Sequence, residues 1–375
     1  MNRTFFELKF RTAIMLLVGL AFNVASVNAQ VVASGDCGAN GNNLTWELTG
    51  TSPNYTLTIS GSGAMANYPY NAMPWYDYLD TIKTVIIDNG VTTIGDNAFF
   101  DCRGLTSVTI PNSVITIGSD AFRACRSLTS VTIPNSVTTI GSSAFGSCER
   151  LNSVTIPNIV TTIEEQTFYG CKSLTSVIIP NSVITIGNYA FGNCFSLTSV
   201  TIGNSVTKIG NYDFNECGGL TSITIPKSVT EIGNFAFGRC RGLTSITNLN
   251  PVPVSINANV FYDVNVNACT LKVVTSALSA YKNAAVWKDF IIEDISANNI
   301  NNYTYNSTVN VYPNPTRGEL RIDNGEMING DVEILDVVGR VVFRSKQETT
   351  MDISHLSSGI YFLKIAGKTV KIIKN

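Results

Sequence analysis

Charged residues and histidine are scarce in this chain. Lys, Arg, Asp and Glu make up 14% of its 375 residues, and the formal net charge is -2, whereas an average globular protein carries about 25% charged residues. The chain therefore lacks the basic excess of a nucleic-acid-binding protein, and we expect no nucleic-acid partner. Its one histidine, His355, lies outside the repetitive part of the chain, which argues against imidazole catalysis and His-rich metal sites.

The local signatures of enzymes and metal sites are missing as well. The chain has no GxSxG, no phosphate loop and no zinc signature, and its cysteines form no CxxC pair. Glu164 and Glu165 are adjacent in the sequence, so these two acids are not expected to converge on one substrate. We therefore expect a protein that is not an enzyme, with no catalytic residues, no bound metal and no cofactor.

The N-terminus has the features of an export signal. Basic residues precede a short apolar run from Ala13 to Phe22, and the segment Val27–Ala29 ends in a small residue. We expect cleavage between Ala29 and Gln30. The apolar run is shorter than the ~20 residues of a membrane-spanning helix, although a retained anchor helix is the alternative. No other segment is long and apolar enough, so we expect no membrane span after signal removal.

From residue 82 to residue 246 the chain repeats itself every 23 residues. The phenylalanine column comprises Phe99, Phe122, Phe145, Phe168, Phe191, Phe214 and Phe237. The cysteine column comprises Cys102, Cys125, Cys148, Cys171, Cys194, Cys217 and Cys240. A fixed period of this length is typical of a solenoid with one coil per repeat.

One unit shows why the coils must stack. Leu105, Val108 and Ile110 alternate with hydroxyl residues, which predicts a short strand with one face inward. Pro111 ends this strand because proline has no N–H to donate. The residues expected to point inward are Leu105, Val108, Ile110, Val114, Ile117, Ala121, Phe122 and Cys125. A single coil cannot bury these eight residues, so stacking must build a parallel sheet over one continuous core, with a helical turn near Ala121–Cys125.

Four residues depart from the repeat. Glu164 replaces a glycine, Thr167 and Asp213 replace an alanine, and Gly203 replaces a proline. We expect less regular coils at these places, and we expect a buried Asp213 to need a partner.

The nine cysteines would suggest disulfides in an exported protein. The seven repeat cysteines instead share an apolar column with phenylalanine, where free cysteine behaves as a small hydrophobe. Cys37 and Cys269 fall near opposite ends of the repeats and are not expected to pair. We therefore predict buried free thiols that form part of the structural core.

The unit Leu-Thr-Ser-Val-Thr-Ile-Pro-Asn-Ser-Val-Thr-x-Ile-Gly-x-x-Ala-Phe-x-x-Cys resembles the BspA-type leucine-rich repeats of bacterial surface proteins. The segments Asp36–Gly38 and Pro74–Tyr76 are similar to the N-terminal cap of that family, and Leu271–Val273 and Trp287–Phe290 are similar to its C-terminal cap. The resemblance implies a mainly β, right-handed leucine-rich-repeat solenoid of seven coils plus caps, with short helical turns.

The region after residue 308 predicts a small β-sandwich. The expected strands are Val309–Tyr312, Glu319–Ile322, Val332–Leu335, Arg340–Arg344, Gly359–Ile365 and Thr369–Ile373. The motifs Val311–Pro315, Asp336–Arg340 and Leu356–Tyr361 are similar to the type A sorting domain of the type IX secretion system. This resemblance implies contact with the secretion machinery and a location outside the outer membrane of a Gram-negative bacterium, either secreted or on the cell surface.

These features divide the chain into six expected parts. They are a signal peptide (1–29), an N-terminal cap (30–81), leucine-rich repeats (82–246), a C-terminal cap (247–295), a linker (296–308) and a sorting domain (309–375).

The exposed strand face of the repeats is the candidate binding site. Its column comprises Thr109, Thr132, Thr155, Ile178, Thr201, Thr224 and Thr247. A second candidate is the partly basic stripe that follows the cysteines, namely Arg103, Arg126, Glu149, Lys172, Phe195, Gly218 and Arg241. The family resemblance implies adhesion to proteins or glycans on host or bacterial surfaces. The alternative is a structural coat or spacer protein without a specific ligand, which the uniform repeats favour.

Overall fold

The computed structural model describes residues 30–295, 310–312, 316, 318–323, 331–336, 340–346, 350–365 and 368–374. The described residues form two compact units that divide near residue 300. The predicted signal peptide with Ala29, the linker 296–308, the Pro313–Pro315 motif and residues 337–339 lie outside the described residues. Gln30 is the first described residue and is exposed.

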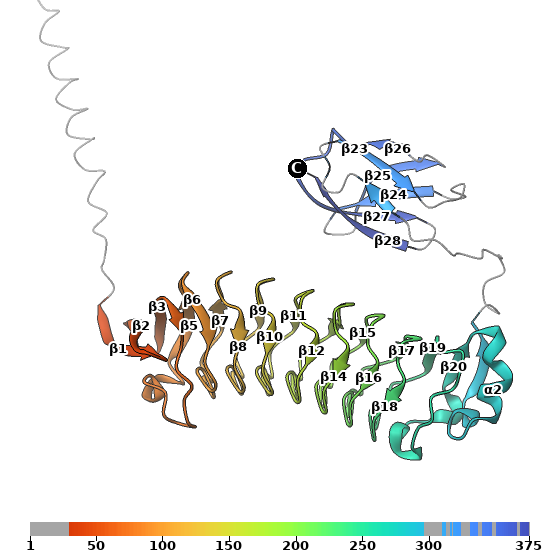
Figure 1. Cartoon of the computed structure of the whole chain (residues 1–375), viewed down its shortest axis with the longest axis horizontal. Coiled ribbons are helices and arrows are strands. Elements are labelled where there is room, and N and C mark those ends of the chain that lie inside the picture. Colours follow the sequence, from red (N-terminus) through yellow and green to blue (C-terminus); the bar gives the residue numbers. More distant parts are fainter. Residues whose placement is uncertain are drawn as a thin grey trace, which may run out of the picture. The chain divides into compact units, whose positions relative to one another are not determined.

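The first unit is a solenoid of stacked coils between β1 and α2 (Figure 1). The first strands of the repeated coils are β5 (Ile82–Ile87), β7 (Ser107–Thr109), β9 (Ser130–Thr132), β11 (Ser153–Thr155), β13 (Ser176–Ile178), β15 (Ser199–Thr201), β17 (Ser222–Ile225) and β19 (Ser245–Asn248). Pairing is parallel and in register; Ser153 and Thr155 of β11, for example, lie opposite Ser130 and Thr132 of β9. The 23-residue period thus becomes a stack of equivalent positions, and the predicted mainly β solenoid is confirmed.

A second row of short strands forms another side of each coil. It comprises β6 (Val91–Ile94), β8 (Thr116–Ile117), β10 (Thr139–Ile140), β12 (Thr162–Ile163), β14 (Thr185–Ile186), β16 (Lys208–Ile209) and β18 (Glu231–Ile232). The segment predicted as a helical turn follows this row. In the repeated coils it is a tight turn instead, because two residues per coil adopt left-handed backbone angles, as at Asp120 (φ 54°) and Ala124 (φ 60°). Its N–H groups bond to the next coil, for example from Phe122 to the carbonyl oxygen of Ala144 at 2.8 Å.

The phenylalanine column forms a continuous stack of rings in the core. Neighbouring rings from Phe99 to Phe237 lie 5.1 to 5.8 Å apart between centroids and are nearly parallel. Trp75 extends the stack at one end and Phe261 at the other. All seven phenylalanines are fully buried, and burial of each should contribute about 1.5–3 kcal/mol.

The cysteine column is buried as well, and all nine cysteines of the chain are free. From Cys125 onward, each repeat thiol donates a hydrogen bond to the phenylalanine carbonyl oxygen of the preceding coil. The Sγ–O distances are 3.2 Å for Cys125, 3.2 Å for Cys148, 3.2 Å for Cys171, 3.3 Å for Cys194, 3.3 Å for Cys217 and 3.1 Å for Cys240. A thiol therefore fills an apolar space and also partners a buried carbonyl group, which alanine cannot do.

The departures from the repeat have different outcomes. A Cβ atom on Gly141 would lie 2.5 Å from the backbone nitrogen of Ser119 on the preceding coil. Glu164 occupies the position equivalent to Gly141 and carries a side chain there. The second row of strands is interrupted at this coil, because β10 and β12 belong to different sheets. Gly203 preserves its turn, since its carbonyl oxygen accepts from Val206 at 3.2 Å as Pro111 does from Val114. The irregularity expected at Glu164 is present, whereas Gly203 retains this turn hydrogen bond.

The two buried polar replacements also differ. Thr167 is satisfied, because its hydroxyl donates to the carbonyl oxygen of Glu164 at 2.8 Å. Asp213 is fully buried, and neither carboxylate oxygen has a hydrogen-bond partner of good geometry. The partner expected for Asp213 is therefore missing from the described residues.

The caps close the two ends of the solenoid. β1 (Val31–Gly38), β2 (Gly41–Thr51) and β3 (Asn54–Gly61) form an antiparallel meander, and β3 pairs in parallel with β5. β20 (Thr270–Val273) and β21 (Ile291–Asp294) extend the parallel sheet beyond β19 at the other end. Helical turns occur in these caps, including η1 (Tyr76–Tyr78) and α2 (Leu278–Asn283). The caps cover the apolar end coils that a repeat array would otherwise expose.

The second unit consists of two antiparallel sheets. One has the order β22 (Asn310–Tyr312), β23 (Glu319–Asp323), β26 (Thr350–Asp352). The other has the order β25 (Val341–Lys346), β24 (Asp331–Leu335), β27 (Gly359–Ile365), β28 (Lys368–Lys374). Both sheets contribute to one small core, with Leu320 and Met351 from the first and Ile334 and Leu363 from the second.

Candidate ligand-binding surface

The predicted threonine column lies along the outer face of the first strands. Thr109, Thr132, Thr155, Thr201 and Thr224 are exposed, while Thr247 is half-buried. Ile178 interrupts the column and is 69% exposed. The hydroxyl groups of the column make no hydrogen bond within the described part of the chain. They are therefore free to bind a partner, and we call these seven residues the strand-face column.

Other threonines near this face have a structural role. The hydroxyl of Thr198 donates to the carbonyl oxygen of Thr175 at 3.1 Å, and that of Thr244 donates to Thr221 at 3.2 Å. Each of these bonds joins a residue to its counterpart on the preceding coil. The chain thus uses one threonine column to link coils and presents another to solvent.

The partly basic stripe carries little free charge. Arg103 pairs with Asp101, Lys172 with Glu149 and Arg241 with Asp263. These exposed ion pairs contribute little to stability, typically about 0–1 kcal/mol each, but they neutralise three of the four basic residues of the stripe and leave only Arg126 without an ion pair among the described residues. An acidic partner is therefore not favoured there.

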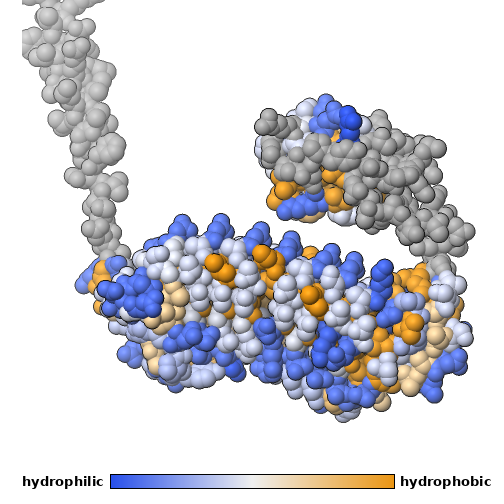
Figure 2. All heavy atoms as spheres, viewed as in Figure 1, coloured by the Kyte–Doolittle hydropathy of each residue, from blue (hydrophilic) through white to orange (hydrophobic). Residues whose placement is uncertain are grey.

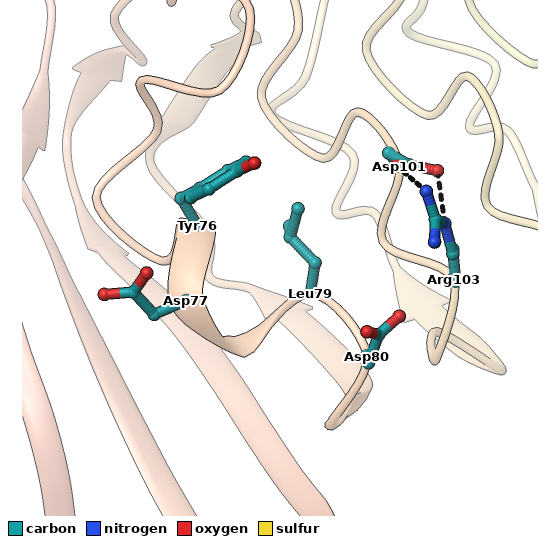
Figure 3. Close-up of a pocket in the computed structure, with 6 residues that line it drawn as sticks. All are labelled: Tyr76, Asp77, Leu79, Asp80, Asp101 and Arg103. Atoms are coloured by element: carbon teal, nitrogen blue, oxygen red, sulfur yellow. Dashed lines mark hydrogen bonds and ion pairs between the residues drawn. The ribbon is translucent and has the colours of Figure 1, made fainter.

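A small pocket lies where the N-terminal cap meets the repeats (Figure 3). Tyr76, Asp77, Leu79 and Asp80 come from η1 and the residues after it, and Asp101 and Arg103 come from the next coil. Figure 3 shows the Arg103 guanidinium turned toward Asp101, which it contacts through two nitrogen atoms at 2.9 and 2.7 Å. The basic group is thus already engaged with Asp101.

Sequence analysis missed a column of aromatic residues on the turns. Tyr189, Tyr212 and Phe235 are half-buried, and their rings stack at centroid distances of 4.6 and 4.8 Å. Their 23-residue spacing was visible in the sequence, but their position on an outward turn was not. We call these three residues the aromatic ridge.

The aromatic ridge is unusual because its backbone is left-handed. Tyr189, Tyr212 and Phe235 have φ angles of 58°, 57° and 55°. The four preceding coils carry Asn97, Asp120, Ser143 and Gln166 at this position. Left-handed angles cost a residue with a side chain about 1–2 kcal/mol, with Asn and Asp the usual exceptions. Ring stacking contributes about 0.5–1.5 kcal/mol per pair, so stability alone does not favour aromatic residues here.

A cavity of about 430 Å³ adjoins the C-terminal end of the aromatic ridge. Its lining residues are Tyr212, Asn215, Phe235, Arg239 and Tyr262. The rings of Phe235 and Tyr262 meet at 70° with centroids 5.7 Å apart. The Arg239 guanidinium lies over the Tyr262 ring at 5.9 Å and also pairs with Glu216. We call this space the ridge cavity.

Burial keeps thiols of the core in their protonated form. Burial raises the pKa of the Cys148 thiol to about 12 and that of Cys269 to about 11, so both thiols stay protonated at neutral pH. No group of three or more metal-ligating side chains occurs among the described residues. In the same residues, every helix is too short or too polar to cross a membrane.

Figure 2 shows that apolar side chains on the visible face of the solenoid form small separate patches along the coils, with a denser area near the C-terminal cap. Exposed apolar residues in the C-terminal cap include Val252, Tyr262 and Ile291.

Comparison with known proteins agrees with this architecture. The family profile described as BspA type leucine rich repeat region matches residues 75–194 and 161–285. The profile described as secretion system C-terminal sorting domain matches residues 310–375. A search of curated proteins gives no match.

Several solved structures are similar to this chain. A leucine-rich repeat protein from Bacteroides ovatus is 24% identical, with 62% of this chain and 70% of that chain covered and a TM-score of 0.43. The T. pallidum leucine rich repeat protein is 25% identical, with coverage of 53% and 86% and a TM-score of 0.36. A leucine rich cell surface protein from Faecalibacterium prausnitzii is 22% identical, with coverage of 72% and 96% and a TM-score of 0.34.

The C-terminal sorting domain directs the protein to the type IX secretion machinery and so to the outside of a Gram-negative cell. The repeat profile covers more than half of the chain, over the same coils that stack in the structure. The chain belongs to the BspA-type leucine-rich-repeat family and carries a type IX sorting domain at its C-terminal end.

Proposed function

We propose that this exported protein is a non-enzymatic binding module that adheres to proteins or glycans on host or bacterial surfaces through the strand-face column. The observation that supports the proposal is the set of exposed hydroxyl groups in register along the sheet. Each is free of internal hydrogen bonds in the described residues, and each recurs once per coil. A row of rigidly spaced donors and acceptors is well suited to an extended partner, because the protein loses little conformational entropy on binding.

The proposed function requires that the chain is first exported and processed. Removal of residues 1–29 between Ala29 and Gln30 gives the mature N-terminus, and residues 309–375 act as the sorting domain. Residues 30–81 and 247–295 serve as caps, and residues 296–308 as a linker.

The test compares two double variants with the unmodified protein. Thr132→Arg combined with Thr155→Arg places bulky charges on two adjacent strands of the column. Asn135→Arg combined with Asn158→Arg adds the same charges in the same coils, on exposed residues beyond the strands. Binding to immobilised matrix proteins, mammalian cells, bacterial cells and a glycan array is measured for all three. We expect the threonine variant to lose at least tenfold in affinity and the asparagine variant to lose less than threefold.

The second candidate function is a coat or spacer without a specific ligand. The uniform coils favour it, because a ring stack that repeats with little change makes a stiff rod whether or not its surface binds anything. Saturable binding that depends on the strand-face column supports the adhesin. Flat responses across the whole panel support the spacer.

A further inference from the structure

We infer that the ridge cavity is a second binding site, which takes a ring of a neutral saccharide. This site lies on the turns, about half a coil further along the chain than the strand-face column, and Tyr212 and Thr201 mark the two positions in one coil. It goes beyond the proposed function and does not depend on it.

The walls of the ridge cavity suit the carbon-bound hydrogen atoms of a sugar ring. Phe235 and Tyr262 form a corner of two rings, and Tyr262 is 52% exposed. The faces of aromatic rings carry partial negative charge, and they attract the weakly positive C–H groups on the face of a saccharide. Gly238 leaves room for the Asn215 amide, since a Cβ atom on Gly238 would lie 2.6 Å from Asn215 Nδ2.

The polar groups of the cavity suit sugar hydroxyls. Asn215 donates through Nδ2 to the carbonyl oxygen of Gly238 at 3.1 Å, which fixes its amide and leaves Oδ1 to accept. Arg239 is held by Glu216 and by the Tyr262 ring, and its remaining N–H groups can donate. The Tyr212 hydroxyl can both donate and accept. An acceptor, a planar donor and a hydroxyl therefore surround one small space, as expected for a ligand with hydroxyl groups around a ring.

The charges near the cavity favour a neutral ligand. Arg239 pairs with Glu216, and Arg241 pairs with Asp263. These pairs leave no excess charge to select an anionic sugar or a phosphate. The volume of about 430 Å³ lies within the ~300–1,000 Å³ of small-ligand pockets, which is room for a ring and part of its neighbour.

The backbone supplies an independent argument. Phe235 and Tyr212 have aromatic side chains at a left-handed position where the four coils from residue 97 to residue 166 carry Asn97, Asp120, Ser143 and Gln166. Strained residues are concentrated at functional sites, where the function maintains them against the cost in stability. The rings of Tyr212 and Phe235 at this position are among those that line the ridge cavity.

The left-handed angle also gives a clean test, because Phe235→Asn installs the residue that the same position carries at Asn97. This variant removes the ring and relieves the left-handed strain, at the loss of the ring contacts with Tyr212 and Tyr262. Tyr189→Asn is the control: it replaces another ring of the aromatic ridge with Asn two coils away, in a residue that does not line the cavity. Arg239→Lys retains the charge and removes the planar donor fork.

Binding of the full-length protein is measured by isothermal titration calorimetry against cellohexaose, maltohexaose, mannohexaose and xylohexaose. A proline-rich peptide and sialyllactose serve as further probes. We expect at least one neutral hexasaccharide to bind with a Kd below about 1 mM, which is a weak interaction of about -4 kcal/mol. Phe235→Asn and Arg239→Lys should weaken it at least tenfold, and Tyr189→Asn and Thr132→Arg should leave it within threefold.

Three results would overturn the inference. They are the absence of binding to every neutral saccharide, saccharide binding that Phe235→Asn leaves unchanged, and a preference of the ridge cavity for the proline-rich peptide or for sialyllactose. Because Thr132→Arg alters only the strand-face column, a loss of surface adhesion in that variant with intact saccharide binding separates the two sites.

Discussion

The thiol of Cys194 donates a hydrogen bond to the carbonyl oxygen of Phe168 on the preceding coil, at 3.3 Å. The same bond recurs from Cys125 to Cys240, and all nine cysteines are buried. We predict that none of the nine cysteines reacts with Ellman's reagent in the native protein and that nine react in guanidinium chloride. Disulfide-linked repeat peptides in unreduced digests of the exported protein would contradict this arrangement.

The ring stack should depend on every member. We predict that Phe191→Ala costs about 3–5 kcal/mol in unfolding free energy, because it opens a cavity between Phe168 and Phe214. Phe195→Ala is the control: this ring belongs to the same coil but is exposed, and its loss should cost less than about 0.5 kcal/mol. Urea denaturation followed by circular dichroism measures both. Equal costs for the two variants would refute a core role for the column.

Asp213 should destabilise the solenoid at neutral pH. Burial raises the pKa of its carboxyl group well above the ordinary value of 3.8, and the backbone N–H groups of Ala190 and Phe191 only moderate the rise. Below pH 3.8 the folded and unfolded chains are both protonated at this residue. Above it, the unfolded chain releases the proton and the folded chain retains it, so folding stability falls as pH rises.

Asp213→Ala restores the residue that Ala190 and Ala236 provide in the neighbouring coils. We predict a gain of at least about 1–3 kcal/mol at pH 7, the usual cost of an unsatisfied buried polar group. The gain should shrink toward pH 3. Melting temperatures between pH 3 and pH 8 measure the effect, and a gain independent of pH would show that the carboxyl group does not titrate as described.

Glu164 should mark a local weakness between adjacent coils. Gly118, Gly141, Gly187 and Gly233 at this position donate N–H bonds to the preceding coil at 2.8–2.9 Å. We predict that Glu164→Gly closes the gap between β10 and β12 and slows hydrogen exchange of the residue 161 and 164 amides. Glu165→Gly, one residue further along the chain, is the control and should leave exchange there unchanged.

The sorting domain should be necessary for passage across the outer membrane. We predict that a chain lacking residues 309–375 accumulates in the periplasm, while a chain lacking only the strand-face threonine side chains is exported normally. Fractionation of the producing cells measures both, and surface display of the truncated chain would overturn the assignment.

The coils could be predicted from the sequence because their apolar residues recur periodically. The phenylalanine and cysteine residues recur every 23 residues, so a correct interpretation of one repeat applies to every other repeat. The strands β22, β23, β24, β25, β27 and β28 of the second unit were also predicted, since turn residues separate alternating runs. β26 (Thr350–Asp352) was missed, because three residues give no pattern and its place is fixed by pairing with β23.

The surface was harder to predict because local sequence does not reveal where a side chain points. Alanine, phenylalanine and cysteine at helical spacing predicted a helical turn at residues 121–125, but left-handed angles at Asp120 and Ala124 turn the chain outward. The equivalent left-handed angles at Tyr212 and Phe235 place these two residues on the surface. The ion pairs of Lys172 and Arg241 depend on contacts with the neighbouring coil, so the low free charge of the stripe could not be predicted from the sequence either.

The in-register pairing of equivalent positions has a consequence for the insertion and deletion of repeats. Cys125 and Cys148 occupy the same place in successive coils and make the same bond to the coil before. Recombination between the corresponding codons would delete or duplicate 23 residues and rejoin the chain in phase, with both caps intact. A gain or loss of whole coils would therefore preserve the core, while a slip of any other size would disrupt it.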